Sequence, residues 1–268
     1  MKSRVARAGK EPCWGAERPW PSWLFHRPAS VLPADTRTWV TVLAVLFHST
    51  MSAPVSRTGD SSSSSNDHPL WVNPCNLPDD ASGHADHLSP QDVRNMLDAV
   101  ANRARVASEE ADKAKRRFLE RTFSDSEFED SVASYMQSWL PNVPTPSQDH
   151  FKSMTKEEAY KTTFGYVQYY AVGLEQAVLD QIFHNGPFHR LFLEIQQNLG
   201  QLLCELQIGI VHFNVAKNPD VLRDVMSHEY RDIKQDSQRN LRDYIILREY
   251  IRLTRYISEL FAYLRDHS

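Results

Sequence analysis

Apolar residues recur every three or four positions through most of residues 89–266, which is the spacing of one buried face of an α-helix. The first such stretch opens with SPQD at 89–92, which offers an N-cap serine, a proline for the first turn and an acid within that turn. A second cap-like stretch at 124–127 predicts a bend, after which the spacing continues to Trp139. The pattern therefore predicts one bent helix over 89–139.

Three further helices follow with the same spacing. A capping box, Thr155 to Glu158, opens a helix over 155–184, and an Asn-Gly-Pro turn separates it from a helix over 187–213. The last helix ends near residue 265. Its predicted inner face consists of Ile246, Tyr250, Leu253, Ile257, Leu260, Phe261 and Leu264. Since no stretch alternates with a period of two for long enough to predict a strand, the expected fold class is all-α.

The lengths of the connections between these helices favour one topology. About 14 Pro-rich residues join the first two helices, a three-residue turn joins the next two, and a longer stretch precedes the last. An extended chain covers about 3.3 Å per residue, so 14 residues can cross about 45 Å and return along a long helix. The pattern favours a long-chain four-helix bundle with up-up-down-down topology over a simple up-down bundle.

The N-terminal third has a different composition. An apolar run of nine residues, WVTVLAVLF at 39–47, precedes small residues up to Ala53, which indicates a signal region over 1–53 with cleavage after Ala53. A membrane span needs about 20 apolar residues, so a signal anchor is the weaker alternative, and we expect a secreted protein whose mature form does not insert into a membrane. Residues 54–88, with serines at 61–65, predict a disordered leader, and 89–268 form the helical domain.

Charge and cysteines narrow the class further. Residues 54–268 hold 23 Lys and Arg against 31 Asp and Glu, a formal net charge of −8, which argues against nucleic acid or anionic lipid as a partner. Removal of the signal region leaves Cys75 and Cys204. In an oxidising compartment two cysteines are expected to form a disulfide, and the alternative is two free thiols.

Motifs for catalysis are missing from the sequence, which has no Gly-rich phosphate loop, no Cys-x-x-Cys pair, no Gly-x-Ser-x-Gly and no His-Glu-x-x-His. We therefore expect no enzyme activity, no metal and no cofactor. Acids and histidines in the leader (Asp79, Asp80, His84, Asp86 and His87) are interpreted as solvated linker. His184 and His189 flank a turn and are interpreted as polar surface.

Two segments carry a resemblance to a known family. The stretch SYMQSWLPNVPTPSQDHF after the first helix and RDYIILREYIRLTRYISELF in the last helix resemble interleukin-6-type long-chain cytokines, in particular the cardiotrophin-like, ciliary neurotrophic and leukaemia inhibitory factor branch. The chain also resembles the arthropod unpaired ligands to a comparable degree. The resemblance implies a ligand that brings cell-surface receptor chains together and activates Janus kinase and STAT signalling. It also implies a Cys75–Cys204 bridge, similar to the leader-to-third-helix bridges of those proteins.

One departure concerns a receptor motif of that branch. The Phe-x-x-Lys motif that precedes the last helix in leukaemia inhibitory factor relatives is replaced here by Ser-Gln-Arg-Asn at 237–240. We therefore do not expect that branch's specific receptor.

The last helix also predicts a binding surface. Arg248, Arg252, Arg255 and Glu259 fall opposite its inner face, and Ile245, Tyr256 and Tyr263 fall along the edge. Tyr and Arg concentrate binding energy at interfaces, and the last helix supplies a receptor site in the family that this chain resembles. The predicted receptor-binding residues are Arg252, Tyr256, Tyr263, Arg255 and Ile245, with Trp139 from the segment after the first helix. The alternative is a solvated face of i, i+4 pairs.

Two other functions compete with signalling. A secreted helical carrier or scaffold would need a core too large for its side chains, whereas a ligand needs binding residues that face solvent. An intracellular helical adaptor would require residues 39–47 to be a buried segment. As a ligand, the protein is expected to be a monomer when free.

Overall fold

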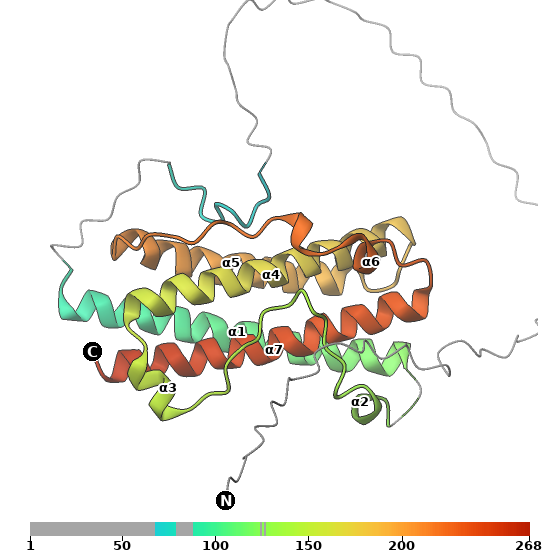
Figure 1. The fold of residues 1–268 in the computed structure, drawn as a ribbon, viewed down its shortest axis with the longest axis horizontal. Coiled ribbons are helices and arrows are strands. Elements are labelled where there is room, and N and C mark those ends of the chain that lie inside the picture. The colour runs from blue at the N-terminus through green and yellow to red at the C-terminus, as the bar shows by residue number, and fades with distance from the viewer. Residues whose placement is uncertain (1–67, 79–87, 124, 126) are drawn as a thin grey trace, which may run out of the picture. The chain divides into compact units, whose positions relative to one another are not determined.

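The computed structural model describes residues 68–78, 88–123, 125 and 127–268 (Figure 1). Its regular secondary structure in these residues is entirely helical, which confirms the all-α prediction. The long helices are α1 (Pro90–Thr122), α4 (Lys156–Phe183), α5 (His189–His212) and α7 (Asp236–Asp266). The short ones are α2 (Phe128–Ser131), α3 (Gln148–Ser153), the 3-10 turn η3 (Arg223–Val225) and α6 (His228–Arg231). The predicted signal region, 1–53, lies outside the described residues.

The N-cap residues predicted from the sequence cap α1 and α4 in the structure. The Ser89 hydroxyl accepts the backbone N–H of Asp92, and the Asp92 carboxylate accepts the N–H of Ser89, so the capping box of α1 is complete. The Thr155 hydroxyl accepts the N–H of Glu158 at the start of α4. Between α4 and α5, Asn185 takes a positive φ of 50° and closes the tight turn that was predicted there.

The first helix is shorter than predicted. α1 ends at Thr122 and not near 139, because Phe123 leaves the helix with an extended backbone (φ −123°, ψ 120°) and stacks on Phe128 at 3.7 Å between ring centroids. After the single turn of α2, residues 132–147 contain no helix. Of the apolar positions that prolonged the helical spacing, Val132 and Trp139 are buried although the chain there is irregular, whereas Met136 is 51% exposed.

Each long helix packs against two of the others, and the neighbouring pairs are α1–α7, α1–α5, α4–α5 and α4–α7. Along α1 and α7, Asp98 meets Arg265 near one end while Asp112 meets Arg255 further along, so these helices are antiparallel. The other three pairs are antiparallel by the same reasoning. Between α1 and α5 the contacts are Phe118–Phe188 and Arg103–Gln201, and between α4 and α5 they are Tyr160–Phe213 and Gln181–Phe188. Between α4 and α7 they are Tyr160–Phe261 and Asp180–Arg242. Figure 1 shows the consequence, since α1 and α4 run one way and α5 and α7 return.

Close packing fills the space between these helices. All seven residues predicted for the inner face of the last helix are buried in α7. The Tyr160 ring of α4 lies so close to Gly209 of α5 that a Cβ at this glycine would clash with it. Within the described residues, no helix combines the length and the apolar character needed to cross a membrane.

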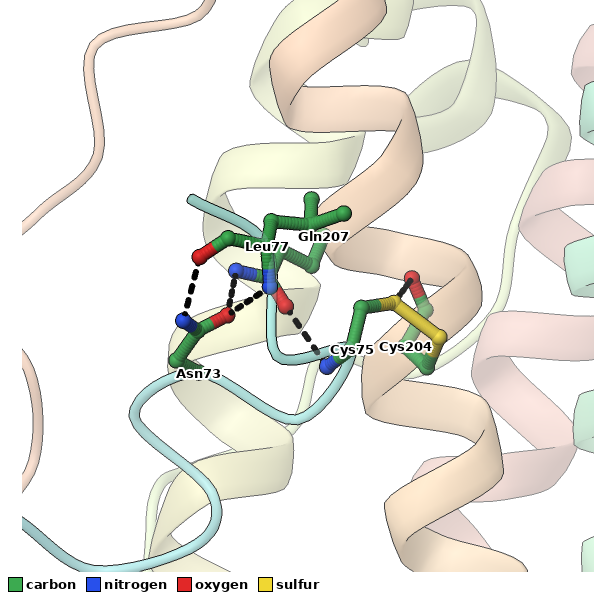
Figure 2. Close-up of a disulfide and its surroundings, with 5 residues drawn as sticks. All are labelled: Asn73, Cys75, Leu77, Cys204 and Gln207. Atoms are coloured by element: carbon green, nitrogen blue, oxygen red, sulfur yellow. Dashed lines mark hydrogen bonds between the residues drawn. A yellow bond between two sulfur atoms is a disulfide. The ribbon is translucent and has the colours of Figure 1, made fainter. Parts of the chain in front are cut away.

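Part of the predicted disordered leader is folded, so that prediction is wrong for residues 68–78; the rest of 54–87 lies outside the described residues. Cys75 forms a disulfide with Cys204 of α5 (Figure 2). Beside it, the Gln207 side chain accepts the N–H of Cys75 at 3.0 Å and donates to the Asn73 side chain at 2.7 Å. Trp71 is buried, and its indole N–H donates to the carbonyl of Val221 at 2.7 Å.

The segment 68–78 thus fastens three parts of the chain together. Gln168 of α4 donates to the Trp71 carbonyl and to the Asp220 side chain, while its own amide oxygen accepts the N–H of Val221. The Arg223 guanidinium lies over the Trp71 ring at 5.4 Å from its centroid. A buried tryptophan and a disulfide compensate the ordering entropy of a short segment that has no helix of its own.

Candidate functional site

The last helix is covered on more sides than its spacing predicted. Three of the six residues predicted to bind receptors are buried, with exposed fractions of 2% for Ile245, 1% for Tyr256 and 8% for Trp139. Their prediction as a solvent-facing contact surface is therefore wrong. Other segments of the chain already occupy the positions that a partner would take.

Tyr256 is buried because α3 packs against it. The Ser147 hydroxyl accepts the N–H of His150 and caps this short helix, which was not predicted. The His150 Nε2 atom and the Tyr256 hydroxyl are hydrogen-bonded at 2.8 Å, and the Phe151 ring lies 6.1 Å from the Tyr256 ring. Burial raises the pKa of the Tyr256 hydroxyl to about 12. A tyrosine with its hydroxyl and ring both engaged within the fold is a packing residue.

Trp139 is packed against α4 and is linked to α7 through Gln137. The Trp139 indole N–H donates to the Gln137 side chain at 2.8 Å, and Gln137 in turn donates to the backbone carbonyl of Arg242 at 2.9 Å. The Trp139 ring reaches α4 at Gly173, where a Cβ would lie only 2.9 Å from its Cη2 atom. Trp139 therefore joins the irregular segment to α4 and α7.

A buried ionic cluster lies at the start of α7. The Arg242 guanidinium is fully buried and donates to Asp180 of α4 at 2.7 Å, to Asp243 at 2.6 Å and to the carbonyl of Tyr230 at 3.0 Å. The second carboxylate oxygen of Asp243 has no hydrogen-bond partner. Burial raises the pKa of Asp243, although the neighbouring Arg242 opposes the shift. No periodicity argument identifies such a cluster, since arginine and aspartate count as surface residues in a helical pattern.

Arg248 was predicted to face solvent, and it instead secures the irregular segment after α2. Its guanidinium donates to the backbone carbonyls of Val132 at 2.9 Å and of Tyr135, and it pairs with Glu249 at 2.7 Å. Arginine suits this position because its planar fork offers five N–H donors to acceptors that no helix satisfies.

The predicted surface that remains accessible centres on two arginines. The side chains of Arg252 and Arg255 are 58% and 60% exposed. Arg252 pairs with Glu249 at 2.9 Å, and Arg255 lies 3.9 Å from Asp112 of α1. Tyr263 is half-buried, and its ring stacks on His267 at 4.0 Å. We call Arg252, Arg255 and Tyr263 the outer face of α7.

The described residues contain no group of three His, Cys, Asp or Glu placed to hold a metal ion. Two surface hollows lie beside α1, one toward the end of α7 and one toward α5, and polar side chains line most of both. Comparison with known proteins adds no identification. No family model, curated protein or solved structure matches this chain.

Proposed function

We propose that this protein is a secreted helical ligand that brings cell-surface receptor chains together and activates Janus kinase and STAT signalling. We further propose that its four long helices form the up-up-down-down bundle of interleukin-6-type long-chain cytokines. Support for the topology comes from the four antiparallel neighbour pairs and from the long connections on either side of the short α4–α5 turn.

The observation that carries the proposal is the exposure of Arg252 and Arg255 on a helix that is otherwise largely buried. Each is more than half exposed and makes one ion pair. The Arg255–Asp112 pair contributes little to stability because it is exposed, and Glu249, the partner of Arg252, is also paired with Arg248, so neither arginine is required by the fold. Arginine is enriched at protein interfaces and among the residues that dominate binding energy. Tyr263, half-buried on the same helix, adds an aromatic contact area that is already ordered by its packing.

The disulfide supports the proposed location. Disulfides persist in oxidising compartments, and the Cys75–Cys204 bond is embedded in a specific network of hydrogen bonds from Asn73 and Gln207. Such a bond suits a secreted protein, and so does the apolar run at 39–47 that precedes it in the sequence.

Expression of the full chain in animal cells tests the secretion part of the proposal. We expect the protein in the culture medium with its N-terminus at Pro54 and with both Cys75 and Cys204 resistant to alkylation. Retention inside the cell, or a free thiol in the secreted protein, would contradict it.

A panel of cell lines carrying a STAT reporter then tests the signalling part. We expect the secreted protein to raise STAT phosphorylation, and the double substitution Arg252→Ala with Arg255→Ala to weaken cell-surface binding by about tenfold or more. The matched control is Arg117→Ala with Arg190→Ala, which removes two exposed arginines of α1 and α5.

Equal weakening by both pairs would mean that overall charge drives binding and not the outer face of α7. Tight binding to cells without STAT phosphorylation would favour the alternative, a secreted helical carrier or scaffold without signalling activity.

A further inference from the structure

The irregular segment after α2 is held rigidly although it contains no helix. The Arg248 guanidinium binds the carbonyls of Val132, Ala133 and Tyr135, and Gln137 is fixed to the backbone of α7 through the carbonyl of Arg242. A loop whose polar backbone groups are already satisfied loses little conformational entropy when a partner binds. This preorganisation distinguishes the segment from an ordinary mobile connection.

The irregular segment after α2 exposes side chains of types that are common at protein–protein interfaces. Met136 is 51% exposed, and Tyr135 beside it is partly exposed. The Met136 sulfur lies 3.6 Å from the Arg248 guanidinium, so Arg248 also fixes the position of this side chain. Methionine and tyrosine are enriched at protein–protein interfaces, where each offers apolar area with an adaptable or polar end.

Acidic residues precede this pair closely in the sequence, on α2 and just before it. Asp125, Glu127 and Asp130 are exposed, and none of them forms an ion pair with another described residue. Glu129 differs, because it binds Lys115 of α1 and the Tyr244 hydroxyl and so belongs to the fold. From residue 124 to residue 151 the sequence contains no lysine or arginine.

We propose that Tyr135 and Met136, flanked by Glu127 and Asp130, form a second docking surface for a basic protein partner. This inference rests on the proposed function, in which the partner is a second receptor chain whose basic side chains surround a small apolar socket. Charge complementarity selects the occupant: an uncompensated acidic rim attracts lysine and arginine and repels anionic lipid, nucleic acid and sulfated polysaccharide.

The two surfaces would then differ in charge. The outer face of α7 presents arginines, whereas the proposed second surface would present the exposed carboxylates of Glu127 and Asp130 with Met136. A ligand with two surfaces of opposite charge can bind two receptor chains selectively, because each surface repels the receptor chain that binds the other surface.

The test uses the secreted full-length protein, fluorescently labelled, with binding measured on the surface of cells whose STAT reporter responds to it. We expect Met136→Ala to weaken binding by about tenfold, as truncation of an interface anchor does. Glu127→Gln with Asp130→Asn should weaken it by a similar factor and reduce its sensitivity to salt, because the attraction is electrostatic.

The matched control is Glu157→Gln with Glu158→Gln, which removes the same charge from exposed acids at the start of α4 and should leave binding unchanged. Wild-type affinity in the Met136 variant, or tighter binding after the acids are neutralised, would overturn the second surface. If Arg252→Ala with Arg255→Ala still weakens binding in that case, the proposed function stands alone. Failure of the wild-type protein to bind any cell of the panel would overturn both.

Discussion

Two pairs of arginines in α7 have different surroundings. Arg242 and Arg248, in the first half of the helix, are enclosed by α4, by the carbonyl of Tyr230 and by the irregular chain after α2. Arg252 and Arg255, one to two turns further along, project into solvent with a single carboxylate each. Residue type and helix are the same, so the difference comes from the segments that cross the helix.

The comparison distinguishes arginines that stabilise the fold from arginines that can bind a partner. An arginine contributes to the fold where several of its donors find carbonyl and carboxylate acceptors in a dry environment. It stays available for a partner where water already hydrates most of its guanidinium. In α7 the first condition holds for Arg242 and Arg248, and the second holds for Arg252 and Arg255.

The largest effect that tests this division is expected for Arg242→Met. Removal of the guanidinium leaves Asp180 and Asp243 buried without their cation, which should lower the free energy of unfolding by about 3–5 kcal/mol. Chemical denaturation of the secreted protein measures the loss. A change below about 1 kcal/mol would place Arg242 in the same class as the exposed arginines.

The same variant should change the dependence of stability on pH. Burial raises the folded-state pKa of Asp243 above the unfolded value near 3.8, so its protonation favours the folded state. This contribution is fully present below about pH 4 and is lost as pH rises through the folded value. Without Arg242, which opposes the shift, the folded pKa rises further, and the loss of stability should extend to higher pH than in the wild type. Parallel curves for the two proteins would contradict this account.

A smaller loss is expected for Arg248→Ala. The carbonyls of Val132 and Tyr135 would lose a charged donor but regain water, so the free energy of unfolding should fall by about 2 kcal/mol. Hydrogen exchange should reveal the consequence locally, as faster exchange at residues 132–139 with little change in α5. Uniform acceleration across the bundle would instead mean that Arg248 supports the whole core.

The sequence predicted the parts of this molecule that depend on local spacing. Ser89 and Thr155 identify helix starts because a cap needs only residues close in sequence, and the inner face of α7 follows from its period. Cys75 and Cys204 pair as the resemblance implied. These predictions require no knowledge of what crosses a helix.

The candidate surface was predicted less well for the same reason. Helical spacing places Tyr256 at the edge of the core, but only the fold shows that His150 and Phe151 cover it. Spacing likewise prolonged the first helix to Trp139, because apolar residues that recur every three or four positions give the same pattern in irregular chain as in a helix. In the leader, Trp71 was a missed signal, since a lone tryptophan near a cysteine suggests an anchored segment.

Two tyrosine hydroxyls of α7 differ in the same way, and removal of either should change the free energy of unfolding by about 1 kcal/mol or less. The Tyr256 hydroxyl is hydrogen-bonded to His150, whereas the buried Tyr250 hydroxyl has no partner. Tyr256→Phe should therefore cost about 1 kcal/mol, and Tyr250→Phe should leave stability unchanged or raise it. Thermal unfolding of the two variants measures the difference. The reverse order would mean that the Tyr250 hydroxyl is satisfied and that Tyr256 is not held by α3.

The smallest effect on stability is expected where the effect on binding is largest. Arg252→Ala with Arg255→Ala removes two guanidinium groups that are more than half exposed, so the free energy of unfolding should change by less than about 0.5 kcal/mol. Glu249 is buried beside Arg252, but Arg248 still neutralises it at 2.7 Å, so no uncompensated charge results. Denaturation and cell-surface binding, measured on the same preparation, separate the two roles. A loss of stability comparable to that of Arg248→Ala would show that Arg252 and Arg255 serve the fold as Arg242 and Arg248 do, and the outer face of α7 would no longer be available for a receptor.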